Sequence, residues 1–238
     1  MKIGILKCDS VDTRLTKDHG EYSDMFIDLL SAINPSLTFS IYDIERHQFP
    51  QMLSECDAYL ITGSRHGAYE KHSWTPPLEQ LIRSIKSNPT IKLLGICFGH
   101  QIIAQALGGE VKKSSKGWGL GVSTTNVSTD SIPVWANLNK KEQLNLIVIH
   151  QDQVIEAPKH SHVILKNDFC PNYMLNIAPN ILTIQGHPEF NKAYLQSLMN
   201  IKQDIIPKTT LLEATKSLEK HTDEKIIAHW FSEFLSQK

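Results

Sequence analysis

Cys97 lies between two glycines, Gly95 and Gly99, at positions −2 and +2 from the thiol. Residues 93–109 have the pattern of a strand, a tight turn and a helix, and glycines at this spacing are typical of a nucleophile elbow, because a sharp turn needs small neighbours. Such a turn presents its side chain above the carboxyl ends of the strands, and the following helix N-terminus favours a thiolate. The spacing therefore predicts a cysteine nucleophile, with the N–H of Phe98 as an oxyanion donor. The alternative is a glycine-rich turn that holds an incidental buried cysteine.

His187 and Glu189 supply the groups that such a thiol needs. They flank Pro188 directly after the last predicted strand, at residues 181–185, and in open α/β sheets the carboxyl ends of the strands form the active-site edge. An imidazole can take the thiol proton and later protonate a leaving nitrogen, while a carboxylate can hold its tautomer. Two alternatives are a metal-binding His-x-Glu pair, for which a third ligand is missing, and a surface turn with a solvated carboxylate. The combination with Cys97 favours the catalytic pair.

No other cysteine or histidine spacing predicts a metal or cofactor site. The chain has four cysteines without a CxxC pair, which we expect to be free thiols in a reducing compartment: Cys8, Cys56, Cys97 and Cys170. Four further histidines lack metal-ligand spacing, and we expect them to be solvated or hydrogen-bonded: His66, His72, His160 and His162. We therefore expect no metal and no cofactor.

The composition argues against several classes of partner. The 238 residues include 24 Lys and Arg against 25 Asp and Glu, so no global field favours nucleic acid or an anionic membrane. The first residues read as a strand and lack the long apolar region of a signal peptide, and no run approaches the ~20 apolar residues of a membrane span. We expect a cytoplasmic protein that binds neither nucleic acid nor membrane.

Short apolar runs alternate with segments of helical period, which is the pattern of a parallel sheet covered by helices on both faces. The predicted strands are residues 2–6, 38–42, 58–61, 92–96, 122–127, 146–149, 163–166, 174–177 and 181–185. The pattern predicts a doubly wound, mostly parallel α/β fold. Residues 110–166 are rich in Thr, Ser, Val and Asn, so we expect an antiparallel extension there.

Helical periodicity marks segments on both sides of the strands. The predicted helices are residues 22–33, 77–86, 192–204, 210–220 and 223–236, with a further helix that begins near Phe98. We expect one domain over residues 1–238, with a core at about 1–190 and a helical C-terminal cap at about 191–238. The alternative is that a helix of this cap binds a partner protein instead of packing on the sheet.

Taken together, these segments resemble the class I glutamine amidotransferases. The resemblance spans roughly residues 3–190 and rests on five segments: residues 61–64 (ITGS), 95–101 (GICFGHQ), 116–121 (KGWGLG), 149–152 (IHQD) and 186–189 (GHPE). It implies a flavodoxin-like fold. It also implies a triad of Cys97 as nucleophile, His187 as base and acid, and Glu189 as orienting group. The implied reaction forms a γ-glutamyl thioester and releases ammonia or an amine, and then glutamate.

The resemblance also implies an oxyanion hole formed by Gly63 and Phe98. The substrate contacts that it implies are Ser64, Gln101, His150 and Gln151. The sequence departs from the family pattern at two of these places. The glycine loop continues with Ser64 and Arg65 instead of a run of glycines, and Ile149 stands where the family usually has serine.

Several functions remain open at this point. The segment from Gly63 to Trp74, the early Cys8-Asp9 pair and the helical tail are similar to stand-alone members that include γ-glutamyl peptide hydrolases. The nearest coupled relative is the glutaminase subunit of GMP synthase, which supplies ammonia to a separate synthetase. A catalytically silent binding or regulatory module on the same fold is the non-enzymatic alternative. A DJ-1-like stress protein would need an acid shortly before the cysteine, and residues 92–96 contain none.

Overall fold

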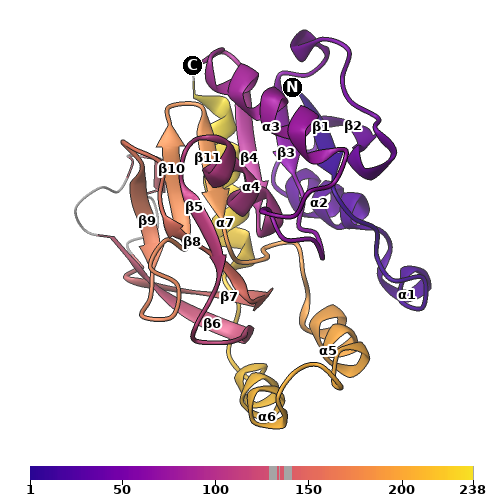
Figure 1. The fold of residues 1–238 in the computed structure, drawn as a ribbon, viewed down its shortest axis with the longest axis vertical. Helices are drawn as coiled ribbons and strands as arrows, with labels where there is room; N and C mark the ends of the chain where they lie inside the picture. The colour runs from indigo at the N-terminus through magenta and orange to yellow at the C-terminus, as the bar shows by residue number, and fades with distance from the viewer. Residues whose placement is uncertain (129–132, 134, 137–140, 238) are drawn as a thin grey trace.

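The computed structural model describes residues 1–128, 133, 135–136 and 141–237, and these form one nine-stranded mixed sheet and one small two-stranded sheet with helices around them (Figure 1). The parallel half of the large sheet contains, from the edge inward, β2 (Thr38–Asp43), β1 (Lys2–Lys7), β3 (Ala58–Ile61), β4 (Lys92–Ile96) and β11 (Ile181–Ile184). Strands β3, β4 and β11 are buried along their whole length, as expected for parallel strands whose two faces are both covered by helices. The predicted α/β fold is confirmed.

Antiparallel strands continue this sheet to its other edge. They are β10 (Met174–Ala178), β9 (His162–Lys166), β6 (Gly119–Val127) and β7 (Gln143–His150). The predicted extension is confirmed, although β6 starts at 119 instead of 122 and β7 at 143 instead of 146. Since antiparallel neighbours alternate in direction, β7 points the same way as β4 and β11. His150, the last residue of β7, therefore lies at the same edge as the carboxyl ends of these strands.

Two short strands that local sequence did not predict form the small separate sheet. They are β5 (Glu110–Lys113) and β8 (Asp152–Glu156), which pair in antiparallel fashion. Each is mostly polar, and one apolar residue of each, Val111 in β5 and Val154 in β8, is buried in the core. Each strand is stabilised mainly by pairing with the other, which is distant in the sequence. Because neither strand has a clear alternation of apolar and polar residues, its own sequence hardly indicates a strand.

The helices that periodicity predicted are all present, with ends that differ by a few residues. The structure contains α1 (Thr16–His19), α2 (Tyr22–Ser31), α3 (Thr75–Lys86), α4 (Phe98–Ala106), α5 (Lys192–Ile201), α6 (Lys208–Ser217) and α7 (Glu224–Ser236), with short 3-10 helices at Ile44–Arg46 and Leu53–Glu55. Among these described helices, none combines the length and the apolar character that a membrane crossing requires.

The helices cover the sheet in two layers. Phe26 of α2 and Phe231 of α7 are buried in the core on one face, whereas Ile82 of α3 and Ile102 of α4 are buried in the core on the other. The remaining C-terminal helices, α5 and α6, lie beyond the end of β6 and β7 (Figure 1). Leu195 of α5 belongs to a third apolar cluster there, which closes that end of the molecule.

The turn between β4 and α4 packs too closely for any side chain at its two glycines. A Cβ atom on Gly99 would lie 2.3 Å from the carbonyl oxygen of Ile61 in β3, and one on Gly95 would lie 2.7 Å from the carbonyl oxygen of Gly99. The backbone N–H of Gly99 donates a hydrogen bond to the carbonyl of Thr62 at 3.1 Å. The glycines predicted for the elbow are therefore required by the contact between two backbone segments.

A Gly99→Ala variant tests this packing. We expect its free energy of unfolding to fall by about 1–3 kcal/mol, because the added methyl meets a backbone oxygen that can move only with β3. Denaturant unfolding measures the change. Gly67→Ala is the control, since its Cβ would meet at 3.1 Å the ring of Tyr69, which is 46% exposed and free to shift. Equal effects of the two substitutions would contradict the close approach.

Candidate functional site

Cys97 occupies the turn between β4 and α4 with a strained backbone. Its φ of 52° and ψ of −99° lie in a region that costs a residue with a side chain about 1–3 kcal/mol. The surrounding structure holds it there, because its N–H donates to the carbonyl of Ile184 at the end of β11, at 2.8 Å. The predicted strand, turn and helix are confirmed, and the thiol lies at the carboxyl edge of the sheet.

His187 follows β11 and is fixed on three sides. Its N–H donates to the carbonyl of Ile147 in β7 at 2.8 Å, and its ring stacks on Phe190 with centroids 4.0 Å apart and planes 3° apart. Its Nδ1 lies 2.7 Å from Oε1 of Glu189, whose side chain is 1% exposed. Because a carboxylate only accepts, Nδ1 carries a hydrogen and Nε2 is directed to the remaining side of the ring.

The charge of His187 is decided by two opposing effects. Burial alone would lower the pKa of this imidazole, but the nearby charges of Glu189 and Cys97 outweigh it and raise the pKa to about 10. The ring therefore keeps its positive charge at neutral pH and loses it only as the pH rises through that value. A cation at this place favours the thiolate form of Cys97.

Gly63, two residues after the end of β3, brings a third chain segment next to Cys97 and His187. A Cβ atom on Gly63 would lie 3.0 Å from Cε1 of His187 and 3.7 Å from Cβ of Cys97, so the loop touches both side chains. Within the described part of the chain, the backbone N–H groups of Gly63 and Phe98 donate no hydrogen bond. Two free donors next to a thiol are what a developing oxyanion requires.

A cavity of about 300 Å³ opens over these groups. Its lining includes Gly63, Cys97 and His187. The four substrate contacts that the sequence resemblance implies also line it: Ser64, Gln101, His150 and Gln151. The structure thus brings to one cavity side chains from the ends of β3, β4, β7 and β11.

Gln101 and Gln185 form a buried amide chain beneath the thiol. The Nε2 of Gln101 donates to the carbonyl of Asp152 at 2.8 Å and to Oε1 of Gln185 at 3.0 Å. This orientation directs Nε2 of Gln185 to the sulfur of Cys97, at 3.5 Å. Sequence reasoning did not identify Gln185 as a site residue, although its position two residues before His187 was a usable signal.

Two of the other predicted substrate contacts, His150 and Ser64, have side chains that already bond within the protein. His150 is 5% exposed and its Nδ1 lies 3.0 Å from the carbonyl of Asp152. Burial lowers the pKa of His150 to about 4, so its ring is neutral at physiological pH. The hydroxyl of Ser64 accepts a hydrogen bond from the N–H of His66 at 3.2 Å and so stabilises the loop after β3.

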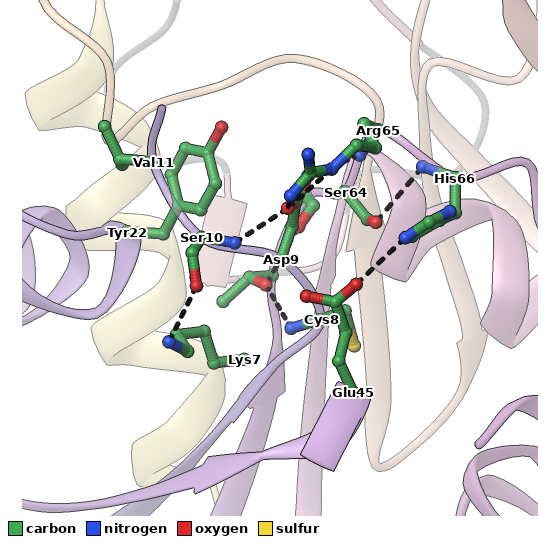
Figure 2. A network of polar contacts seen from close by, with 12 residues as sticks. Lys7, Cys8, Asp9, Ser10, Val11, Tyr22, Glu45, Ser64, Arg65 and His66 are labelled. Carbon is green, nitrogen blue, oxygen red and sulfur yellow. Dashed lines mark hydrogen bonds and ion pairs between the residues drawn. The ribbon is translucent and has the colours of Figure 1, made fainter. Parts of the chain in front are cut away.

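Asp9 holds the same loop in place from the other side. This carboxylate, 4% exposed, accepts hydrogen bonds from the backbone N–H and the guanidinium of Arg65, including one from Nε at 2.9 Å (Figure 2). Both residues line the cavity, and the Arg65 side chain is 61% exposed at its rim. The buried anion thereby orients both the glycine loop and a cation at the cavity mouth.

Spacing alone did not connect His66 with His72, yet the loop after β3 brings them together. Their ligand atoms and a carboxylate oxygen of Glu70 lie within 4.8 Å of one another. Among the described residues this is the group with donor atoms that suit a metal ion. Its position beside the cavity, and not within the Cys97–His187–Glu189 arrangement, separates it from the chemistry of the thiol.

Comparisons with known proteins concern the family and the fold of this chain. The family model described as glutamine amidotransferase class-I matches residues 18–200. The chain is similar to γ-glutamyl peptidase 2 of Arabidopsis thaliana, with 28% identity over 88% of this chain and 85% of the relative. It is 31% identical to γ-glutamyl peptidase 4 of the same plant, over 77% of this chain and 74% of the relative. A solved glutamine amidotransferase structure from Thermotoga maritima shares the fold, with a TM-score of 0.74 and 20% identity over 99% of both chains.

A His187→Ala variant tests the charge pairing at the thiol. At pH 7 we expect iodoacetamide to alkylate Cys97 about tenfold more slowly than in the parent, because the imidazolium that stabilises negative charge on the sulfur is removed. Mass spectrometry of the Cys97 peptide measures the rate in both proteins.

The control for this experiment is His162→Gln, which changes an exposed histidine at the start of β9. Its alkylation rate should match the parent. A His187→Ala variant that reacts at the parent rate at pH 7 would show that His187 does not favour the thiolate.

Proposed function

The chain belongs to the class I glutamine amidotransferase family, and on this basis we propose that it hydrolyses the γ-amide bond of a γ-glutamyl compound through a triad of Cys97, His187 and Glu189. The observation that carries the proposal is the convergence at the thiol. A strained elbow presents Cys97 beside a buried His187–Glu189 pair at 2.7 Å, with two free backbone donors on adjacent segments. This set of groups fits acyl transfer to a cysteine.

The proposed reaction begins with attack of the Cys97 thiolate on the γ-carbonyl carbon. The N–H groups of Gly63 and Phe98 stabilise the oxyanion, and His187 gives its proton to the departing nitrogen. The carbon–nitrogen bond breaks, an amine or ammonia leaves, and a γ-glutamyl thioester remains. Neutral His187 then takes a proton from water, whose oxygen attacks the thioester. Glutamate is released, and the thiolate and the imidazolium are restored.

Glu189 and Phe190 act on this reaction through His187. The carboxylate holds the hydrogen on Nδ1, so that Nε2 is the atom that exchanges protons with substrate. The stacked ring of Phe190 prevents the imidazole from rotating away. Both partners are already in place before substrate binds, which reduces the entropy that must be lost at the transition state.

The γ-glutamyl part of the substrate is proposed to bind along the side of the cavity formed by Gln101, His150 and Gln151. Gln101 has its amide nitrogen occupied by the protein, so its carbonyl oxygen is the group left to accept from a substrate ammonium. His150 is neutral and orients the strand end from which the Gln151 backbone reaches the cavity. Ser64 shapes the opposite wall through the glycine loop.

The cavity rim favours a γ-glutamyl peptide over free glutamine. Arg65, Lys113 and Lys202 line the cavity, and we propose that a leaving group larger than ammonia extends toward these cations. A peptide leaving group carries a terminal carboxylate that such cations can bind, whereas ammonia offers nothing to them. The relatives named γ-glutamyl peptidases support the same choice of substrate class. Because the nucleophile must be a free thiol, we propose action in a reducing compartment such as the cytoplasm.

The competing function is supply of ammonia to a separate synthetase. A Thermoplasma acidophilum protein that is described as a candidate GMP synthase component has a similar fold, with a TM-score of 0.58 and 17% identity over 84% of this chain. Such a likeness concerns the fold alone. Substrate preference without a partner separates the two functions.

The decisive variant is Cys97→Ala. We expect release of glutamate from γ-glutamyl dipeptides to fall by at least about 10³-fold, because no other group can form the thioester. The parent should also form a covalent adduct at Cys97 with an electrophilic glutamine analogue. Product detection and intact-protein mass spectrometry measure these outcomes, with Cys56→Ala as the matched control.

Three outcomes would contradict the proposal. Full glutamate release by Cys97→Ala would exclude the thioester mechanism. Parent protein that neither hydrolyses γ-glutamyl compounds nor forms the adduct would favour a silent binding module. Hydrolysis of glutamine that appears only after a synthetase is added would favour the coupled function instead.

Substrate discrimination by the rim is tested with Arg65→Gln. We expect the KM for γ-glutamylalanine to rise about tenfold, because a charge-assisted hydrogen bond to the leaving-group carboxylate is lost. The KM for γ-glutamylalaninamide, which lacks that carboxylate, should change by less than about twofold. Steady-state kinetics on the two substrates provide the comparison, and equal losses on both would mean that Arg65 acts through the loop and not on the substrate.

A further inference from the structure

The loop between β3 and α3 places two imidazoles and a carboxylate around one point. Nδ1 of His66 lies 3.5 Å from Oε2 of Glu70, and Nε2 of His72 lies 2.9 Å from the same oxygen. We propose that His66, Glu70 and His72 form a binding site for one divalent transition-metal ion of the zinc class. This site lies outside the proposed Cys97–His187–Glu189 triad, and its test does not depend on the proposed hydrolysis.

The distances suit such an ion. Zinc binds imidazole nitrogen and carboxylate oxygen at about 2.0–2.2 Å, so neighbouring ligand atoms around a tetrahedral centre are about 3.4 Å apart. The two measured separations, 2.9 and 3.5 Å, lie on either side of this value, and all three ligand atoms fall within 4.8 Å of one another. Small side-chain rotations would bring them into contact with one ion.

Glu45 supports this use of His66 from the far side of its ring. Its Oε1 lies 2.9 Å from Nε2 of His66, so the carboxylate holds the hydrogen on Nε2 (Figure 2). The Nδ1 lone pair is then free to point at Glu70 and His72. A carboxylate that accepts from the distal nitrogen of a histidine ligand is the arrangement that fixes tautomer and ring orientation at protein metal sites.

Aromatic packing holds the second histidine. The ring of His72 stacks on Trp74, with centroids 5.3 Å apart and planes 5° apart, and it also lies 4.3 Å from the ring of His66. Because the rings are already oriented, a metal ion would not have to order two free side chains. This lowers the entropic cost of binding.

The lone pairs and the charge of His66, Glu70 and His72 require a cation between these three side chains. A lone pair of His66 faces an oxygen of Glu70 that can only accept, so either a proton or a metal ion must lie between them. Imidazole ligands favour zinc-class ions over Ca²⁺ or Mg²⁺, which prefer oxygen ligands throughout. Of the ligand residues, His66 and Glu70 also line the cavity over Cys97, so the ion would add positive charge to the cavity rim.

The test uses untagged full-length protein in the Cys97→Ala background, because the Cys97–His187 pair could itself bind zinc. We expect one Zn²⁺ per chain by metal analysis after equilibration and desalting, with a micromolar or lower Kd by titration calorimetry. Co²⁺ should give the visible absorption of a four- or five-coordinate site. Absence of stoichiometric binding in this background would overturn the proposal.

Variants locate the ion. His72→Gln should weaken Zn²⁺ binding at least tenfold through loss of a ligand, and Glu45→Gln should weaken it about tenfold or more through loss of the orienting carboxylate. The matched control is His47→Asn, whose parent Nε2 bonds to the hydroxyl of Ser73 at 2.9 Å beside the cluster, and its affinity should be unchanged. Binding that survives His72→Gln, or that depends equally on His47, would show that the ion is held elsewhere and that protons occupy the cluster.

Discussion

The left-handed backbone at Cys97 is the constraint on which the site depends. A φ of 52° is unfavourable for cysteine, and only neighbouring segments can hold it. Strand β11 accepts the Cys97 N–H, while β3 approaches so closely at Gly99 that no side chain fits between them. The same contacts that stabilise the strained turn also fix where the thiol, the Gly63 loop and His187 meet. The strained backbone of the turn and the placement of the thiol therefore result from the same packing contacts.

A buried ion pair is the second feature of the site, and its energetics oppose those of an ordinary core. Burial disfavours a charged imidazole, but the negative charges of Glu189, at 2.7 Å, and of Cys97 reverse the balance. Removal of water strengthens this attraction, since the effective dielectric constant is lower inside the protein than in bulk solvent. In the proposed mechanism this buried imidazolium donates its proton to the leaving nitrogen, which is a role for buried charge that stability alone does not require.

Because the sheet is mixed, an additional strand ends at the edge where the Cys97 thiol lies. A purely parallel sheet would place only β3, β4 and β11 beside the thiol. The antiparallel strands return the chain so that β7 ends there too, which adds His150 and, through the bond between Ile147 and His187, anchors the histidine. Phe190 and α5 then close the space behind the imidazole.

Local patterns in the sequence determined the sheet-and-helix order, the elbow at Cys97 and the His187–Glu189 pair. Each of these depends on residues close together in the chain, where periodicity, glycine spacing and strand ends carry the information. Tertiary structure alone decided the contacts between distant segments. Gln185 reaches the sulfur 88 positions away, Arg65 finds Asp9 56 positions away, and His66 meets Glu45 21 positions away. Such polar partners depend on how the loops fold over the sheet edge, and β5 and β8 likewise exist only through each other, so no local pattern predicts them.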